Sequence, residues 1–283
     1  MHNHKQLIFI SDFFSNQVAG GAELNDEEVI NELERRKYEV VKINSHMVRK
    51  EDILNKKIIV SNFINLAPAV KEYISKNNTY AIYEHDHKYL INRNPAKYKN
   101  FLAPTEKIVN KTFYKNSKVI FCQSKFHENI LSSNLNADNT YNVSGNFWSE
   151  KIFENLLTYS KKNKNDFVSI MNSNNWHKNT LGSIEYCEKN NIKYELIGNM
   201  PYENFLKKVS DNKTFIFIPK TPETLSRIIV ECKMMNMKVI TNKLVGATYE
   251  NWFELSGEAL INKMYSNKKT ILNTIEKKLD MRG

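Results

Sequence analysis

The residues best suited to chemistry are two glutamates, Glu223 and Glu231, with seven residues between them. They follow an apolar run, residues 214–218, that predicts a buried strand, and residues 224–235 predict a helix. Eight steps along a helix cover about 12 Å and return close to the same side. A sugar, a diphosphate and a ribose in a row span a similar length. On this spacing, Glu223 could bind sugar hydroxyls and Glu231 a ribose diol.

The start of this helix is a candidate anion site. The backbone amides of Thr224, Leu225 and Ser226 could hold a diphosphate, because the first amides of a helix lack partners within it. For Glu231 a structural alternative stays open, an ion pair with Arg227 one turn earlier, worth about 0.3–0.5 kcal/mol. Spacing alone favours that ion pair.

Two more candidate positions lie in the first half of the chain. Gly20 and Gly21 follow the first predicted strand and precede a predicted helix, where bare backbone can approach a phosphate group. A tight loop is the structural alternative. His85 ends another predicted strand, where ligand sites of parallel sheets lie. The alternative for His85 is a solvated or capping histidine.

Several well-known motifs are absent from the sequence. It has no G-x-G-x-x-G after the first strand, no G-x-x-x-x-G-K-[ST] and no H-E-x-x-H. It also lacks the D-x-D pair with which one large class of sugar-transfer enzymes holds a metal. These absences argue against ordinary dinucleotide, P-loop and zinc-peptidase chemistry, and we expect no metal site.

Composition is typical of a globular protein, with 41% apolar and 25% charged residues in a chain of 283. No apolar run approaches the roughly 20 residues that a membrane helix needs. The first five residues lead directly into a predicted strand, without the pattern of a signal peptide. The three cysteines are far apart and fit reduced thiols. We expect a cytoplasmic protein, with attachment at a membrane surface as a further option.

The net charge of +10 is spread over both halves of the chain, but one stretch stands out. Residues 88–125 hold nine basic residues and a single acidic one, Glu106. Such a patch could attract an anionic surface or a polyanion, and a solvated face is the alternative. Five aromatic residues are interleaved with the basic ones: Tyr89, Tyr98, Phe101, Phe113 and Tyr114.

Apolar runs with strand-like and helix-like spacing alternate along the chain, which predicts an α/β protein with parallel sheets. Around residues 146–166 the alternation lapses into an amphipathic and then Lys/Asn-rich stretch, the best candidate for a domain connection. We expect two Rossmann-like domains, residues 1–147 and 148–265. A C-terminal helix within residues 266–283, beginning at Lys268, would pack back on the first domain. The cleft between the domains is the default ligand site. The predicted strands are residues 7–12, 38–43, 57–63, 79–83, 118–122, 167–171, 193–197, 214–218 and 238–241.

At residues 219–231 the sequence resembles the acidic motif of retaining glycosyltransferases of GT-B architecture, family 4. That motif is Glu, seven residues and Glu after a strand that ends in Pro. The resemblance extends over most of the chain, although Ser226 stands where the family has Gly. The other matching segments are GGAE at 20–23, His85 with Asp86, VSGN at 143–146, WHKN at 176–179, LIG at 196–198 and LVG at 244–246.

The resemblance implies a GT-B fold, two Rossmann-like domains with parallel sheets facing across a cleft. It implies retaining, metal-independent transfer of a sugar from a nucleotide-diphosphate-sugar, a UDP- or GDP-sugar, to a hydroxyl acceptor. Lys178 and the amides near Gly21 would stabilise the leaving diphosphate, with Arg227 as a further phosphate ligand. His85 would orient the donor sugar or the acceptor hydroxyl. The implied catalytic residues are His85, Lys178 and Glu223, and the implied donor-binding residues are Gly20, Gly21, Thr224, Leu225, Ser226, Arg227 and Glu231.

Two other functions remain open at this point. One is a sugar transferase that acts on nucleic acid, with residues 88–125 holding the polyanion. The other is a module that binds a nucleotide-sugar without catalysis. Neither the acceptor nor the oligomeric state follows from the sequence, and a homo-oligomer is one option.

Overall fold

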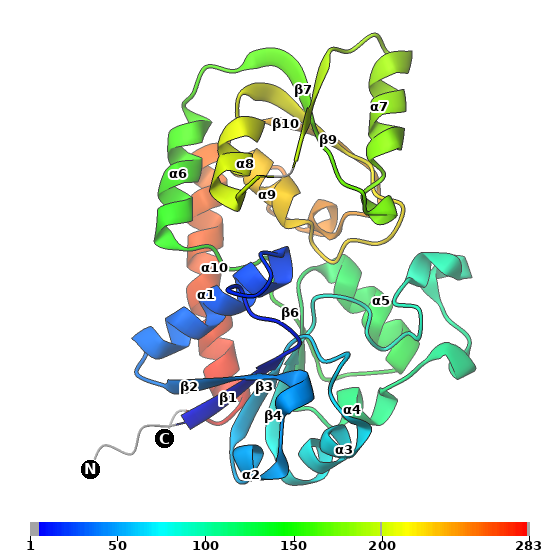
Figure 1. The fold of residues 1–283 in the computed structure, drawn as a ribbon, viewed down its shortest axis with the longest axis vertical. Helices are drawn as coiled ribbons and strands as arrows, with labels where there is room; N and C mark the ends of the chain where they lie inside the picture. Colours follow the sequence, from blue (N-terminus) through cyan, green and yellow to red (C-terminus); the bar gives the residue numbers. More distant parts are fainter. Residues whose placement is uncertain (1–5, 199, 282–283) are drawn as a thin grey trace. The chain divides into compact units, whose positions relative to one another are not determined.

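The computed structural model describes residues 6–198 and 200–281, and its contacts divide the chain into two compact units. Unit 1 comprises Met1–Phe147 and Asn267–Gly283, and unit 2 comprises Trp148–Ser266. Each unit is an α/β structure built on one parallel sheet (Figure 1). The α/β class with two parallel sheets, predicted from the alternating pattern, is therefore confirmed.

Unit 1 contains a six-stranded sheet in the order β2-β1-β3-β4-β5-β6. All neighbouring strands are parallel, so their carboxyl ends lie at one edge. The strands are β1 (Gln6–Ser11), β2 (Glu39–Asn44), β3 (Lys57–Val60), β4 (Thr79–Tyr83), β5 (Val119–Cys122) and β6 (Thr140–Asn142).

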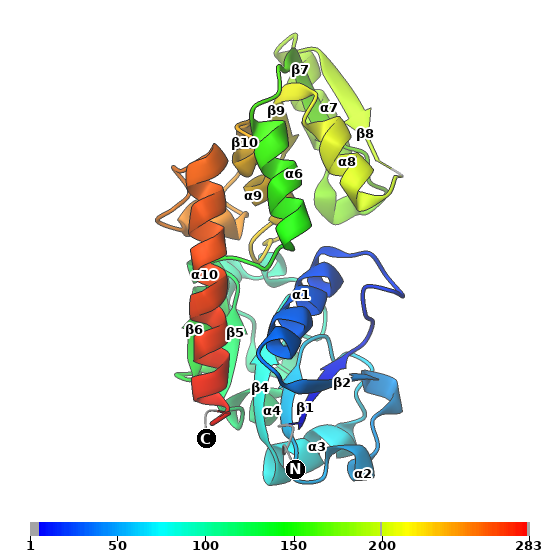
Figure 2. The same ribbon diagram turned by 90° about the vertical axis from the view of Figure 1, so that its left-hand side faces the viewer.

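Helices cover both faces of this sheet. Along β1, Leu7 and Phe9 pack on one face with α1 and the end of α10, while Ile8 and Ile10 pack on the other with α2 to α5 (Figure 2). A strand buried on both faces reads as a continuous apolar run, which is why β1 was identifiable. The helices are α1 (Gly21–Arg35), α2 (Lys50–Ile53), α3 (Pro68–Asn77), α4 (Lys111–Lys115), α5 (Lys125–Leu135) and the last part of α10 (Gly257–Lys278).

Unit 2 contains a four-stranded parallel sheet in the order β10-β9-β7-β8. Phe215 and Phe217 pack toward α6, α8, α9 and the start of α10, and Ile216 packs toward α7 on the other face. The strands are β7 (Asn165–Met171), β8 (Tyr194–Ile197), β9 (Asn212–Phe217) and β10 (Lys238–Thr241). The helices are α6 (Glu150–Ser160), α7 (Thr180–Lys189), α8 (Tyr202–Val209), α9 (Arg227–Met234) and the first part of α10.

The stretch expected to be a domain connection contains the boundary between the two units, after Phe147. Its amphipathic part forms α6, because the Ser149 hydroxyl caps its start and Ile152, Phe153 and Leu156 form a buried stripe. Two expectations about elements need correction. Helix α10 begins at Gly257, not at Lys268. Helix α9 begins at Arg227, not at Thr224. Short 3₁₀ turns occur at Ser45–Met47, Pro95–Lys97, Lys99–Phe101, Thr105–Lys107, Trp176–Lys178 and Gly246–Tyr249.

Within residues 6–198 and 200–281, no helix combines the length and the apolar character that crossing a bilayer requires.

Candidate active site

The carboxyl edge of the sheet in unit 2 brings Lys178 and Glu223 together. Lys178 ends the turn that follows β7, and Glu223 follows the neighbouring strand β9. Lys178 Nζ lies 2.9 Å from Glu223 Oε1 and 3.2 Å from Oε2. The amide of Lys220 donates to the carbonyl of His177 at 2.9 Å, which ties the two loops together. Two residues predicted separately from the sequence thus form one charged pair, with exposed side-chain fractions of 30% and 17%.

The segment from Glu223 to Ser226 is paired with residues 244–247 and is not helical. The amide of Glu223 donates to Leu244 at 2.8 Å, and the amide of Gly246 donates back to Glu223 at 2.9 Å, which forms an isolated parallel bridge. Farther on, the amide of Ala247 donates to Leu225 at 3.0 Å, and Leu225 is fully buried. The prediction that Thr224, Leu225 and Ser226 open a helix is therefore wrong. Eight helical steps do not separate the two glutamates.

Ser226 precedes α9 in a strained conformation. Its φ of 70° lies in the left-handed region, where a side chain costs about 1–2 kcal/mol. Ser226 is 7% exposed, and within the described residues its buried Oγ has no hydrogen-bond partner. A strained residue with an unpaired hydroxyl at a helix start is typical of a site whose ligand completes the bonding.

Glu231 lies one turn into α9 and is almost fully buried, at 1% exposure. Three donors converge on its Oε1: Trp148 Nε1 at 2.8 Å, Tyr202 OH at 2.5 Å and Arg227 Nε at 2.8 Å. The Arg227 guanidinium also lies over the Trp148 ring, 4.6 Å from its centroid. The ion pair that the sequence offered as an alternative is thus present. Among the residues that the structure describes, all three contacts are to Oε1 and none is to Oε2.

In unit 1, Gly20 caps α1 and Gly21 is its first residue. The space that a side chain on Gly20 would fill is taken by the carboxyl group of Glu23. Burial raises the pKa of Glu23, and nearby Asp26 raises it further, while a hydrogen bond from its own backbone amide lowers it. The helix start predicted to bind phosphate therefore already carries a partly buried carboxyl group.

His85 is fixed by hydrogen bonds from both sides of its ring. Its Nε2 lies 2.6 Å from Asp26 Oδ1, and Gln123 Nε2 contacts its Nδ1. Ser61 Oγ donates to the other oxygen of Asp26 at 2.5 Å. These contacts on both ring nitrogens hold the imidazole in one orientation. The side chains of His85 and Asp26 are 3% and 0% exposed.

Sequence reasoning missed several of these groups. Asp26, Ser61 and Gln123 surround His85, and Trp148 and Tyr202 hold Glu231, although none belongs to a local motif. Of these residues, only Asp26 could have been inferred from the sequence, because a helical residue three places after Glu23 lies on the same side of the helix.

The basic stretch 88–125 divides into surface and core. Lys88 is buried and pairs with Glu84, and all five interleaved aromatic residues are buried or half-buried. The aromatics therefore pack in unit 1 and do not form an exposed stacking surface. The exposed cations are Arg93, Lys97, Lys99, Lys107, Lys111, Lys115, Lys118 and Lys125.

No family model and no curated protein sequence matches the chain. Among solved structures, the chain shares its fold with glycosyltransferases of GT-B architecture. HepE from Anabaena, solved with UDP and glucose, is 13% identical with a TM-score of 0.54, over 96% of this chain and 95% of HepE. The catalytic domain of starch synthase IV from Arabidopsis thaliana, bound to ADP and acarbose, is 9% identical with a TM-score of 0.58, over 99% of both chains.

A third similar structure is an α-glucosyltransferase in complex with UDP and a 13-mer DNA. It is 10% identical with a TM-score of 0.51, over 95% of this chain and 90% of that one. At such identities the likeness shows the fold, and the chemistry has to be argued from the residues themselves.

Proposed function

We propose that the protein is a retaining glycosyltransferase that moves a sugar from a nucleotide-diphosphate-sugar to a hydroxyl acceptor without a metal ion. One observation carries the proposal, the row of groups at the carboxyl edge of the sheet in unit 2. Glu223, which pairs with Lys178, Ser226, whose hydroxyl has no partner within the described residues, and Glu231 occur along one segment that leads into α9. Similar folds solved with UDP or ADP support this choice of ligand.

Each group in the row suits one part of the donor. Glu231 Oε2 would accept the ribose hydroxyls. Ser226 Oγ and the first amides of α9, beginning at Arg227, would bind the diphosphate in place of the amides that sequence reasoning assigned to it. Glu223 would accept hydroxyls of the sugar, and Lys178 beside it would contact the leaving phosphate. Arg227 is engaged with Glu231, so it would act by fixing that carboxylate.

The transfer needs little covalent chemistry from the protein. The bond between the anomeric carbon and the phosphate oxygen breaks, and the electron pair stays on the diphosphate. The acceptor oxygen bonds to the same face of the anomeric carbon, and its proton passes to the departing phosphate oxygen. Lys178 would stabilise the charge that develops on that oxygen, which is the interaction that lowers the barrier.

The roles of unit 1 in this reaction stay predictions. His85, held in one orientation, would orient the donor sugar or the acceptor hydroxyl, as the resemblance implies. Gly20 and Gly21 would lie near the phosphate only if the Glu23 carboxyl group moved or became protonated, because an anion is repelled by a carboxylate. A UDP- or GDP-sugar remains the expected donor.

A polyanionic acceptor such as nucleic acid is the second candidate function, favoured by the eight exposed cations of residues 88–125. One protein of similar fold was solved with DNA. A steep loss of binding with added salt would distinguish such an acceptor from a neutral glycan, because phosphate contacts release counterions.

The decisive experiment is a donor screen that uses the natural probes of unit 2. All three tryptophans, Trp148, Trp176 and Trp252, lie in this unit, so their fluorescence reports its unfolding. UDP-, GDP- and ADP-sugars are titrated against thermal unfolding, and a true donor at 100 times its Kd adds about 2.7 kcal/mol. Product analysis then tests retention at the anomeric carbon. Binding without transfer or hydrolysis would indicate a non-catalytic module, and no binding by any nucleotide-sugar would refute the proposal.

A further inference from the structure

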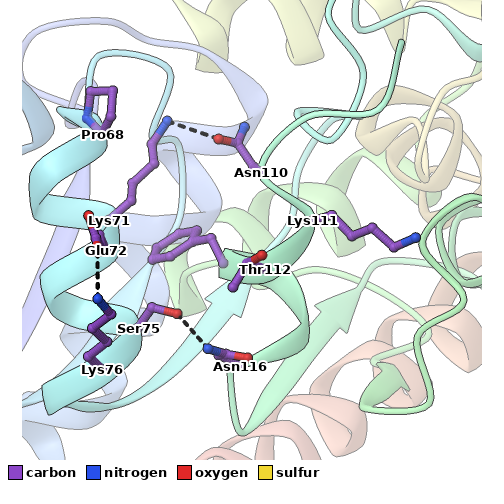
Figure 3. Close-up of a pocket in the computed structure, with 10 residues that line it drawn as sticks. Pro68, Lys71, Glu72, Ser75, Lys76, Asn110, Lys111, Thr112 and Asn116 are labelled. Carbon is purple, nitrogen blue, oxygen red and sulfur yellow. Dashed lines mark hydrogen bonds and ion pairs between the residues drawn. The ribbon is translucent and has the colours of Figure 1, made fainter. Parts of the chain in front are cut away.

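Unit 1 contains a cavity of about 480 Å³ between α3 and residues 110–116 (Figure 3). None of the residues assigned above to donor binding or catalysis lines it. The volume falls within the range of small-molecule sites, which is about 300–1,000 Å³. The cavity therefore has to be considered as a binding site in its own right.

One end of the cavity carries the ammonium of Lys71, which is not paired with a carboxylate of the described residues. Lys71 is half-buried, and its Nζ donates to the side-chain oxygen of Asn110 at a long 3.3 Å. The ammonium also lies 5.3 Å from the centroid of the Phe63 ring. Among the described residues, no Asp or Glu oxygen lies within 4.0 Å of it. Burial lowers the pKa of Lys71, and only the more distant Asp12 opposes that shift.

The other two lysines beside the cavity differ from Lys71. Lys76 is paired with Glu72 at 2.5 Å. The Lys111 side chain points away from α3, as Figure 3 shows, and is exposed. Lys71 is therefore the lysine positioned to meet an anion inside the cavity.

Apart from these lysines and Glu72, the side chains that line the cavity are uncharged. Phe113 is one of them and is 3% exposed. At the far end, Asn116 Nδ2 donates to Ser75 Oγ at 3.0 Å, and the exposed side of this pair can still bond to a polar group. The cavity thus offers a cation at one end, an apolar middle and neutral hydrogen-bonding groups at the other end.

We propose that this cavity binds a monosaccharide-sized organic anion, with one carboxylate or phosphate group on Lys71 and a polar group near Ser75 and Asn116. Such a molecule compensates the buried ammonium and fills the space beside Phe113. The same chemistry could come from a free sugar phosphate or from an acidic sugar unit of a larger acceptor. The inference goes beyond donor binding and stands on residues of unit 1 alone.

The test uses defined probes and the full-length protein. Glucose 6-phosphate, glucuronate and uncharged glucose are titrated, and binding is measured by calorimetry and by shifts of backbone amide NMR signals from α3 and residues 110–116. We expect an anion to bind and glucose not to. Tighter binding of the phosphate would favour a free sugar phosphate, and tighter binding of glucuronate would favour an acidic glycan unit. Failure of both anions to bind at the cavity would overturn the proposal.

Substitutions test whether Lys71 supplies the positive charge that binds the anion. Lys71→Met keeps the side-chain stem and should weaken anion binding roughly 10- to 100-fold, as expected for a lost hydrogen bond to a charged group. Lys71→Arg should retain most of the binding, and Lys111→Met is the matched control that should change nothing. If Lys71→Met fails to fold, Asn110→Asp serves instead, because it supplies a carboxylate that neutralises Lys71 in place. Wild-type affinity in either neutralised variant would overturn the assignment.

The outcome is separable from the donor proposal. Donor binding is measured by tryptophan fluorescence in unit 2, where Lys71→Met should leave nucleotide affinity unchanged. If the wild-type protein binds a nucleotide-sugar but neither anion, only the cavity proposal is refuted. If it binds an anion but no nucleotide-sugar, only the donor proposal is refuted.

Discussion

Replacement of Glu231 by Gln should destabilise unit 2 strongly, although the two side chains have nearly the same shape. The carboxylate is the counter-charge of Arg227, and the two side chains are 2% and 9% exposed. Removing one member of a buried ion pair leaves the other charge uncompensated, at a cost of about 3–5 kcal/mol. For a unit of about 120 residues, this corresponds to a fall in Tm of about 12–20 °C.

Tryptophan fluorescence during urea or thermal unfolding measures this loss, since all three tryptophans are in unit 2. The matched control is Glu203→Gln, which removes a carboxylate from an exposed ion pair of the same unit. Glu203 bonds Lys151 at 2.8 Å, with side chains 45% and 68% exposed, so its loss should cost less than about 1 kcal/mol. Equal stability of the two variants would refute the argument from burial.

The same variant also tests whether Glu231 binds the ribose, because binding is measured on folded protein and is separate from the stability measurement. Folded Glu231→Gln is compared with wild type for binding of a nucleoside diphosphate and its 2′-deoxy analogue. Wild type should prefer the ribose form by roughly 10- to 100-fold, because a hydrogen bond to a carboxylate contributes about 1.5–3 kcal/mol. The variant should lose most of that preference. An unchanged preference would mean that Glu231 serves only the ion pair.

Four other predictions follow from the site and its surroundings. Lys178→Ala should lower kcat by about 10²–10³ with a smaller change in KM, and Lys178→Arg should restore only part of it, as steady-state kinetics would show. Ser226→Gly should raise stability by about 1 kcal/mol by relieving the left-handed backbone and should weaken diphosphate binding, whereas Ser226→Ala should weaken binding without the gain. Transfer activity should persist in excess chelator, and loss restored by Mg²⁺ would contradict metal-independent chemistry. Burial lowers the pKa of His127 well below 6.5, and His87 and Lys88 lower it further, so below about pH 6.5 the unfolded chain binds a proton that the folded chain excludes. Stability measured by circular dichroism should therefore fall on acidification by up to about 1.4 kcal/mol per pH unit, and His127→Gln should flatten that slope.

The fold class was predictable because its evidence is local. The apolar run of β1 is buried on both faces of its sheet, and α8 and β10 have the bounds expected from periodicity and apolar runs. Glu223 was identifiable as a candidate because it follows a strand of a parallel sheet, where ligand sites gather, and Lys178 because its segment resembles a motif of family 4 glycosyltransferases. The 2.9 Å contact between them requires β7 and β9 to be neighbours in the sheet, and the sequence does not show the strand order.

What only the tertiary structure decided is the bonding around each candidate. Nothing within residues 223–226 forbids a helix, but in the structure this segment bonds to residues 244–247, and Ser226 at its end is in the left-handed region. The partners of Glu231 and His85 come from residues up to 83 positions away. Sequence periodicity reports which face of an element is buried, and it carries no information on which distant side chains share that interior. The sequence therefore indicated which residue types form the site. The fold determined which of these side chains pair with one another and which backbone conformation each residue adopts.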